Sequence, residues 1–173
     1  MPMVRQATID DAPRIAEIHV RTWQIAYRGI VFDSILDAMD VSKREQVWRE
    51  NLAKQHELGR MNFVVENESD VAGWVSIGPN RDTDVDIGAV FELYGLYLHP
   101  DHWDKGYGYR LIAHALDWVR AQRKWKEITL WVIEPNARAR RFYERVGYRP
   151  DGATKNWGSQ GCVIPELRYR MTL

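Results

Sequence analysis

The spacing of apolar residues predicts helices in the first third of the chain. In residues 10–28, apolar and aromatic side chains recur at the interval of an amphipathic helix. A short helix is predicted at 33–39. Another begins at Ser42, three residues before Glu45, in the pattern of a capping box. Residues 3–8 alternate weakly and predict one short strand ahead of these helices.

Strands dominate after residue 60, and two further helices are interleaved with them. Residues 61–67 and 71–79 flank a polar turn at 68–70 and predict a hairpin. The elements expected after it are a strand at 90–98, a helix through 111–119, a strand at 127–133, a helix ending at Gly147, a turn entered at Tyr148, and a last strand at 163–173. Helices mixed with a largely antiparallel sheet indicate one α+β or three-layer α/β domain over residues 1–173.

Charge and cysteine content remove several classes of protein. The 24 basic and 24 acidic residues cancel, which excludes a strongly basic protein that binds nucleic acid or a membrane surface. The single Cys162 cannot form an internal disulfide, which suits a reducing compartment. The chain has no apolar run near the roughly 20 residues that span a bilayer, and its start lacks an apolar signal region. We therefore expect a cytoplasmic protein with no nucleic-acid or membrane partner.

The segment Lys105-Gly106-Tyr107-Gly108 predicts an anion site between an apolar strand and an amphipathic helix. Its two glycines let the backbone approach a ligand closely. The start of the helix adds free N–H groups and a partial positive charge, which suit phosphate. A plain tight turn is the alternative. A Walker A loop is missing, and Leu111 stands where a dinucleotide fingerprint needs its third glycine.

A second segment, residues 136–148, predicts a helix with a basic face. Asn136 is a fair N-cap. Arg138, Arg141 and Arg145 fall on one helix face, where they are either solvated or able to reach a phosphate.

Together these segments resemble two motifs of the GNAT acetyltransferase superfamily. Residues 92–111, ELYGLYLHPDHWDKGYGYRL, resemble its acyl-CoA-binding motif, in which a strand ends in Pro and an [RQ]-x-x-G-x-[GA] loop starts a helix. The pattern N-x-x-A-x-x-F-Y-x-x-x-G-[FY] is matched by Asn136, Ala139, Phe142, Tyr143, Gly147 and Tyr148. The opening RQATIDDAPRIAEIHVRTW is similar to the family's first strand and helix, so the resemblance covers nearly the whole chain.

Two positions depart from the family pattern. Trp103 stands at the first loop position in place of Arg or Gln, and Asp104 stands where many relatives have Gly. A carboxylate at Asp104 would either repel a phosphate or cap a helix that opens at Lys105.

The resemblance implies a mostly antiparallel mixed sheet of six to seven strands flanked by four to five helices. It also implies an N-acetyltransferase that moves the acetyl group of acetyl-CoA directly onto a primary amine, without a metal. The acceptor is left open among amino acids, polyamines, amine-bearing antibiotics and protein amines. Whether the protein forms a homodimer is also left open. A non-catalytic CoA-binding sensor or interaction module on the same fold is the alternative. A nucleotide-binding module would not explain the second motif.

The resemblance also assigns roles to residues on the cofactor side. The backbone of Leu96, Tyr97 and Leu98 would pair with the pantetheine arm. Asn136 would contact the same arm, and Tyr143 would donate a proton to the leaving thiolate. The pyrophosphate would be held by the backbone N–H groups of Trp103, Asp104, Lys105, Gly106, Tyr107, Gly108 and Tyr109.

On the acceptor side, Glu92 sits where histone-type members of the superfamily carry a glutamate base. A protonated amine is no nucleophile, so a base has to remove its proton. A period of two places Glu92 and Leu98 on one face of their strand. The alternative for Glu92 is an ion pair with a neighbouring Arg or Lys. Trp23 and Tyr27 share a helix face and would either wall the acceptor pocket or pack in the core.

An acidic run leads into this strand, formed by Asp82, Asp84, Asp86 and Glu92. If it borders the cleft, it would attract a cationic amine; otherwise it is a solvated loop.

Overall fold

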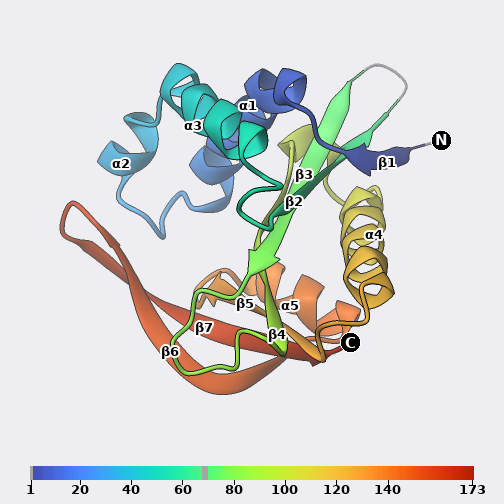
Figure 1. The fold of residues 1–173 in the computed structure, drawn as a ribbon. Helices are drawn as coiled ribbons and strands as arrows, with labels where there is room; N and C mark the ends of the chain where they lie inside the picture. Colours follow the sequence, from blue (N-terminus) through green and yellow to red (C-terminus); the bar gives the residue numbers. More distant parts are fainter. Residues whose placement is uncertain (1, 68–69) are drawn as a thin grey trace.

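A seven-stranded sheet covered by helices forms the body of the computed structural model, which describes residues 2–67 and 70–173 (Figure 1). The strands are β1 Met3–Gln6, β2 Met61–Glu66, β3 Val71–Pro79, β4 Val90–Leu98, β5 Glu127–Ile133, β6 Arg149–Ser159 and β7 Cys162–Thr172. The α-helices are α1 Ala12–Ala26, α2 Asp33–Asp37, α3 Val41–Ala53, α4 Tyr107–Ala121 and α5 Ala137–Val146. Short 3-10 turns occupy Ile9–Asp11 and Pro100–His102. The predicted fold class is confirmed. Most of the turn expected at 68–70 lies outside the described residues.

The strands lie in the order β1-β2-β3-β4-β5-β7-β6, and every neighbouring pair is antiparallel except β4 and β5. This parallel pair is in register only from Val90 with Glu127 to Leu93 with Leu130. Both strands continue beyond that point, β4 to Leu98 and β5 to Ile133, without pairing with each other. The sheet is therefore open at its centre.

The alternation of side chains divides the core between the two faces of the sheet. On β2, Phe63 and Val65 belong to the cluster that includes residues of α4 and α5, whereas Val64 belongs to the cluster built on α1 and α3. Figure 1 shows α1, α2 and α3 gathered on one side of the sheet, with α4 on the other.

A bulge at Tyr94 reverses the alternation along β4. Ile77 of β3 faces Leu93, while the preceding Ser76 faces Gly95, so β4 carries one extra residue. Such a residue shifts every later side chain to the opposite face. Leu96 and Leu98 accordingly pack with the α4 cluster, and Glu92 falls on the other face. The prediction that Glu92 and Leu98 share a face is therefore wrong, because period two does not survive the bulge.

The start of α3 also differs from the prediction. Its N-cap is Asp40, whose carboxylate accepts a hydrogen bond from the Lys43 N–H at 2.8 Å. Ser42 therefore lies inside the helix. Glu45 does not close a capping box, and it bonds to Arg49 at 2.8 Å instead.

Strand β6 was missed in the sequence, which predicted only a turn after Tyr148. The strand is almost entirely exposed and carries no apolar alternation that would have revealed it. It pairs with β7 at the edge of the sheet, and its register shifts between Pro150 and Thr154, around Gly152 with its positive φ of 92°. The resulting hairpin is the long curved ribbon of Figure 1.

Candidate functional site

A cavity of about 870 Å³ occupies the opening between β4 and β5. Its walls come from α1, the last residues of β4 and β5, the start of α4, α5 and the β6–β7 hairpin. The predicted site residues that line it are Trp23, Tyr27, Glu92, Leu96, Tyr97, Leu98, Trp103, Asp104, Gly106, Gly108, Tyr109, Asn136 and Tyr143. The structure thus brings both sequence motifs to one cavity. Lys105 and Tyr107 are not in its lining.

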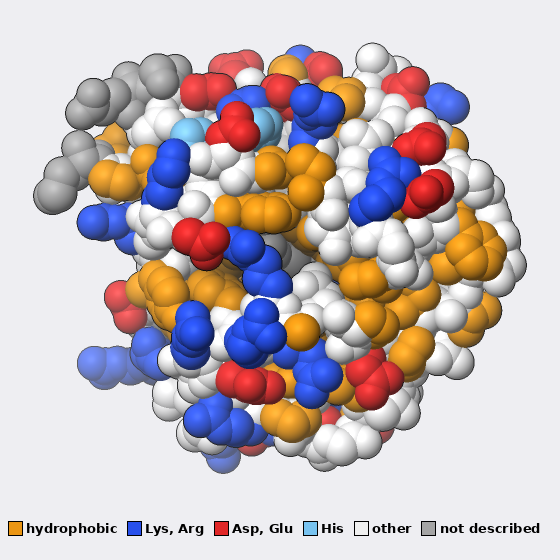
Figure 2. All heavy atoms as spheres, turned by 180° about the vertical axis from the view of Figure 1, so that it is seen from behind, with side chains coloured by type: hydrophobic (Ala, Val, Ile, Leu, Met, Phe, Trp, Pro, Cys, Tyr) orange, Lys and Arg blue, Asp and Glu red, His pale blue; other side chains and the backbone are white. Residues whose placement is uncertain are grey.

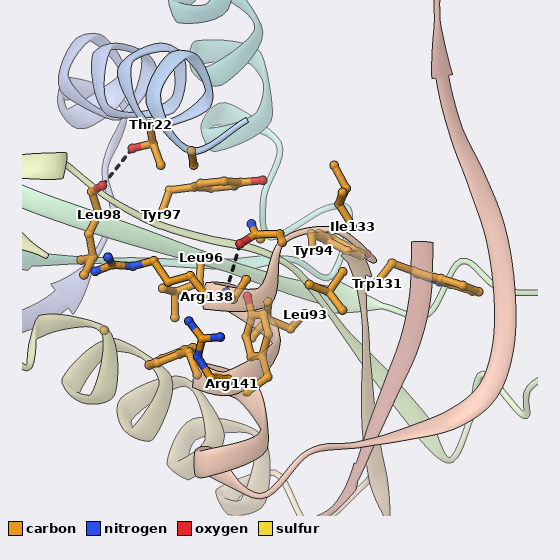
Figure 3. Close-up of a pocket in the computed structure, with 18 of the residues that line it drawn as sticks. Thr22, Leu93, Tyr94, Leu96, Tyr97, Leu98, Trp131, Ile133, Arg138 and Arg141 are labelled. Atoms are coloured by element: carbon orange, nitrogen blue, oxygen red, sulfur yellow. Dashed lines mark hydrogen bonds between the residues drawn. The ribbon is translucent and has the colours of Figure 1, made fainter. Parts of the chain in front are cut away.

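One wall of the cavity is the open edge of β4. The N–H of His99 bonds to Ala72 of β3, and alternate residues direct their backbone to opposite edges. Tyr97 therefore presents its backbone to β3, whereas Leu96 and Leu98 face the opening. The Leu98 carbonyl already accepts a hydrogen bond from the Thr22 hydroxyl at 2.8 Å (Figure 3). It accepts another from the Trp103 indole at 2.9 Å. The predicted backbone role is thus wrong for Tyr97, and Leu96 has the freest backbone of the three.

The segment Lys105-Gly106-Tyr107-Gly108, called the glycine loop below, runs into the first turn of α4. Gly106 is the N-cap and takes the left-handed conformation, with φ of 82°. A Cβ on Gly108 would lie 3.3 Å from the Phe142 ring, so glycine permits the close packing of α4 on α5. The N–H groups of a first helical turn have no carbonyl of an earlier turn to bond. This turn borders the cavity and can receive an anion there. The Trp103 N–H, in contrast, is bonded to the carbonyl of Pro100 at 3.1 Å.

Asp104 does not cap α4, because the helix begins three residues later and has Gly106 as its N-cap. Its exposed carboxylate instead accepts a hydrogen bond from Arg138 of α5 at 2.9 Å. The guanidinium of Arg138 also lies 4.5 Å from the centre of the Trp103 ring, in cation–π geometry. Asp104 has a positive φ of 60°, a backbone conformation that suits glycine better than a residue with a side chain.

Arginines of α5 make this end of the cavity basic. Arg138, Arg141 and Arg145 all line it, as their spacing on one helix face had allowed. Figure 3 shows Arg138 and Arg141 reaching from α5 toward the end of β4. In Figure 2, basic side chains gather around a hollow in one face of the molecule. This end can therefore bind a polyanion.

Two residues of the second motif stand at the middle of the cavity. Asn136 is confirmed as the N-cap of α5, because its side-chain oxygen accepts a hydrogen bond from the Ala139 N–H at 3.1 Å. Tyr143 is 8% exposed and packs edge-on against Phe142. Burial, together with the nearby Tyr97, raises the pKa of Tyr143 above that of an ordinary tyrosine. Its phenol is therefore protonated at neutral pH and can donate a proton.

The other end of the cavity is walled by aromatic rings. Trp23 stacks edge-on against Tyr27, with ring centres 4.7 Å apart, and lies 5.7 Å from Trp157 of β6. Trp131 of β5 completes the wall (Figure 3). Trp23 and Tyr27 line the cavity and also pack against its apolar surroundings, while their role as a wall of the acceptor pocket stays a prediction.

Glu92 is buried in this end and bound to Arg81. Its carboxylate accepts three hydrogen bonds from Arg81, from the backbone N–H at 3.0 Å, from Nε at 3.0 Å and from Nη2 at 2.6 Å. The Arg81 guanidinium also lies 4.2 Å from the centre of the Tyr94 ring. The ion pair that the sequence left as the alternative for Glu92 is therefore formed.

Sequence reasoning missed a second carboxylate here, Glu166 of β7. Its side chain is 14% exposed and lies 3.9 Å from Nζ of Lys155 on β6. Lys155 in turn sits 4.2 Å from the centre of the Trp131 ring. The alternation of Ile164 and Glu166 in the last strand could have placed a carboxylate on an apolar face, but its lysine partner belongs to the strand that was not predicted.

The acidic run at 82–86 does not form an acidic wall. Asp82 and Asp84 bind the buried Arg168 of β7, at 3.2 Å and 2.7 Å. Asp82 also accepts a hydrogen bond from the Trp131 indole at 3.0 Å, and Asp86 accepts one from the Gly88 N–H. Of the two alternatives for this run, the acidic wall is not formed by Asp82 and Asp84, because Arg168 binds both of them and neither residue lines the cavity.

Behind Tyr97, a histidine of α1 is enclosed by aromatic rings. His19 stacks on Tyr97 with ring centres 5.4 Å apart, and its Nδ1 accepts a hydrogen bond from the Trp48 indole at 3.4 Å. Burial, with some help from the charge of Arg44, lowers the pKa of His19 to about 3. The ring is therefore neutral in the folded protein.

Within residues 2–67 and 70–173, no group of three or more His, Cys, Asp and Glu side chains is arranged to hold a metal ion. The helices in the same part of the chain are all too short or too polar to cross a bilayer.

Comparison with known proteins identifies relatives of this architecture. Residues 14–148 match the model of the Acetyltransferase (GNAT) family. The chain is 30% identical over 169 residues to the uncharacterized N-acetyltransferase YuaI of Bacillus subtilis, covering 96% of this chain and 91% of that protein.

Solved structures share the fold at lower identity. The PaiA N-acetyltransferase of Thermoplasma acidophilum, in complex with coenzyme A, superposes with a TM-score of 0.77 at 18% identity, over 100% of this chain and 99% of that one. YncA of Salmonella typhimurium, solved with its cofactor acetyl-CoA, gives 0.73 at 21% identity, over 99% and 94%.

The lowered pKa of His19 predicts a loss of stability in mild acid. Unfolded histidine titrates near pH 6.5, so the unfolded chain binds a proton that the folded chain rejects, and stability falls as the pH drops from about 6.5 toward about 3. Between about pH 6.5 and pH 5, His19 alone should remove about 1.5 kcal/mol from the free energy of unfolding. Urea denaturation of the wild type and His19→Gln at both pH values measures it. The variant should lose less stability on acidification, whereas His56→Gln, at an exposed site, should follow the wild type. Equal losses in wild type and His19→Gln would contradict the assignment.

Proposed function

Because the chain belongs to the acetyltransferase (GNAT) family, we propose that its cavity binds acetyl-CoA and transfers the acetyl group directly to a primary amine. The observation that carries the proposal is the arrangement of this cavity. It joins a basic end, built on the glycine loop and α5, to an aromatic end that contains carboxylates. One cavity can therefore hold an anionic donor and a cationic acceptor next to each other.

The basic end fits the phosphates of coenzyme A. In the proposed complex, the first turn of α4 binds the pyrophosphate through backbone N–H groups, assisted by the arginines of α5. The pantetheine arm then lies along the open edge of β4, where the backbone of Leu96 is free to pair with it as a strand would. Asn136 lies beside the same path. The thioester would reach the middle of the cavity, at Tyr143.

In the proposed reaction, the neutral amine attacks the carbonyl carbon of the thioester. The tetrahedral intermediate collapses with cleavage of the C–S bond, and the Tyr143 hydroxyl transfers its proton to the departing sulfur. A phenol with a raised pKa keeps its proton until the thiolate forms. Tyr143 therefore acts as the general acid.

The amine has to lose a proton before it attacks, and carboxylates at the aromatic end are the candidate bases. Glu92 could serve only if Arg81 released one of its oxygens or if a water molecule relayed the proton, because Arg81 already binds both of them.

A sensor or interaction module on the same fold would need the basic end alone. The enclosed aromatic end, with two carboxylates in its lining, favours an enzyme with an acceptor site. The acceptor in this proposal is a primary amine of a small molecule or of a protein. We also propose that the protein works in the cytoplasm, in keeping with a single cysteine that is buried and unpaired.

Two measurements on the wild type test the proposal. Calorimetric titration with acetyl-CoA should show one site per chain, because the loop, the helix start and the arginines form one anion site. Release of free thiol from acetyl-CoA should then accelerate with at least one member of a panel of amino acids, polyamines, amine-bearing antibiotics and peptides with free N-termini. Absence of acetyl-CoA binding at millimolar ligand would refute the proposal. Binding without thiol release for any amine would support the sensor.

Removal of the Asp104 carboxylate should tighten acetyl-CoA binding. The charge repels phosphate and occupies Arg138, and one such repulsion at 4 Å in water is worth about 1 kcal/mol, or about fivefold in Kd. Asp104→Asn removes the charge alone, whereas Asp104→Gly also relaxes the positive φ. Calorimetry at low and high salt should show both variants binding more tightly than wild type, with a gap that narrows as salt screens the charge. Unchanged or weaker binding at low salt would place the pyrophosphate elsewhere.

Tyr143→Phe should lower kcat by about 10²–10⁴-fold, because the variant keeps the buried ring but loses the acidic proton. The Kd for acetyl-CoA should stay within about twofold of wild type. Tyr148→Phe is the matched control and should keep full activity, because the buried Tyr148 hydroxyl lies outside the cavity lining and has no hydrogen-bond partner among the described residues. Steady-state kinetics with a turned-over amine measure both variants. Full activity in Tyr143→Phe would assign this tyrosine to packing.

A further inference from the structure

The two carboxylates at the aromatic end of the cavity differ in what already binds them. Glu92 is 1% exposed and accepts three hydrogen bonds from Arg81. Its oxygens are therefore occupied, and a proton arriving there would have to displace a charged partner. Such bonds to a charged donor are the strong ones in proteins. Glu92 is thus well placed to hold Arg81 and poorly placed to accept a proton.

Glu166 has no comparable partner among the described residues. The nearest cation, Nζ of Lys155, is 3.9 Å from its oxygen, beyond hydrogen-bond distance. The register places Lys155 directly opposite Glu166 on β6, and it places Ile133 opposite on β5. The carboxylate therefore lines the cavity with oxygen atoms that remain free to accept a hydrogen bond from a ligand.

The surroundings of Glu166 favour an ammonium group. Trp157 lies two pairs further along the β6–β7 ladder, opposite Ile164. Trp131, Trp23 and Tyr27 wall the same end of the cavity. Aromatic faces attract cations, and they also accommodate the apolar body that carries the amine. A carboxylate in an aromatic frame selects amines over neutral analogues of the same shape.

The charges around Glu166 suit a proton acceptor. The groups that face it are Lys155 from β6, Arg81 from the loop after β3, Glu92 from β4 and the hydroxyl of Tyr97. Burial raises the pKa of Glu166 above its ordinary value, and Glu92 adds to the rise, while Lys155 and Arg81 oppose it. A carboxylate of raised pKa is a stronger base toward an ammonium ion.

We infer that Glu166, and not Glu92, binds the ammonium group of the acceptor and accepts its proton. The inference rests on the proposed function and names the acceptor class of that site: a primary ammonium on an apolar or aromatic body. Lys155 acts as a positioning residue that keeps Glu166 ionised before the acceptor arrives.

The proton transfers balance as follows. One ammonium proton moves to an oxygen of Glu166 and leaves a neutral amine, whose lone pair forms the C–N bond. The C–S bond breaks, and the sulfur takes the proton of the Tyr143 hydroxyl. The nitrogen of the new C–N bond then still carries two protons, and one of them moves to the Tyr143 phenolate and restores the phenol. The proton on Glu166 leaves to solvent. The products are the amide, the free thiol of coenzyme A and one proton.

A binding experiment tests Glu166 without any turnover. Benzylamine, which is cationic at neutral pH, and benzyl alcohol, its neutral analogue, are titrated into the protein with coenzyme A present. The tryptophans of the cavity report binding by fluorescence. Wild type should bind benzylamine at least about tenfold more tightly than benzyl alcohol, which is the worth of one charge-assisted hydrogen bond. Glu166→Gln, which is nearly isosteric, should lose this preference, while Glu134→Gln, an exposed glutamate beyond β5, should keep it. No preference in wild type, or an unchanged one in Glu166→Gln, overturns the inference.

Kinetics with an amine that is turned over separate the two glutamates. Glu166→Gln should lower kcat by about 10²–10⁴-fold and remove the acidic limb of the kcat–pH profile. Lys155→Met removes an opposing charge, which raises the pKa of Glu166 further, so the same limb should move to higher pH. Glu92→Gln should keep the limb but move it to lower pH, because the charge of Glu92 adds to the raised pKa of Glu166. A limb lost only in Glu92→Gln overturns the inference.

The failure of this inference and the failure of the proposed function differ in the wild type. If the wild type neither binds acetyl-CoA nor releases thiol with any amine, the proposed function fails. If it does both while Glu166→Gln keeps full activity and full preference for benzylamine, only the role of Glu166 fails. Circular dichroism of each variant confirms that it is folded.

Discussion

The site depends on the separation of two parallel strands after only four paired positions. Beyond Leu93 and Leu130, the edges of β4 and β5 each lose a partner inside the protein, where an unpaired backbone group is unfavourable. Thr22 and Trp103 satisfy the carbonyl of Leu98 with side-chain hydrogen bonds. The backbone of Leu96 is left facing the cavity. A pocket that keeps such an edge open is matched to a ligand that is itself amide-rich and extended.

Arginines bind most of the carboxylates around this opening. Few carboxylate oxygens in the cavity are therefore free to bind a ligand. Arg81 occupies Glu92, and Arg168 gathers Asp82 and Asp84. Each guanidinium can offer several donors to one carboxylate, which leaves the pair with little attraction for a further ion. Glu166 differs because its partner is a lysine held at 3.9 Å on an aromatic face. The carboxylate that arginine binds most strongly and the carboxylate proposed to accept the proton are consequently different residues.

The fold and the basic end of the cavity could be predicted from the sequence because local patterns encode both. Helical spacing revealed α1, α4 and α5, and the two glycines marked a left-handed N-cap and a close helix contact at Gly106 and Gly108. The acceptor end was less visible because its determinants are not local. The bulge at Tyr94 becomes apparent only against β3, and β6 is an exposed edge strand without alternation. Glu166 gains its environment from strands that only folding brings together.

The chain has no net charge, but the two ends of the cavity differ in charge. One end carries three arginines of α5, whereas the other combines aromatic walls with ion pairs of zero sum. At the basic end, Asp104 serves as an internal counterion of Arg138 and accepts a left-handed backbone to do so. A phosphate that bound Arg138 would have to displace this carboxylate, so donor affinity is set by competition between two anions for one guanidinium. Under the proposed function, this competition would weaken binding of the acetyl-CoA donor. It would also favour release of the coenzyme product, which carries the same phosphates.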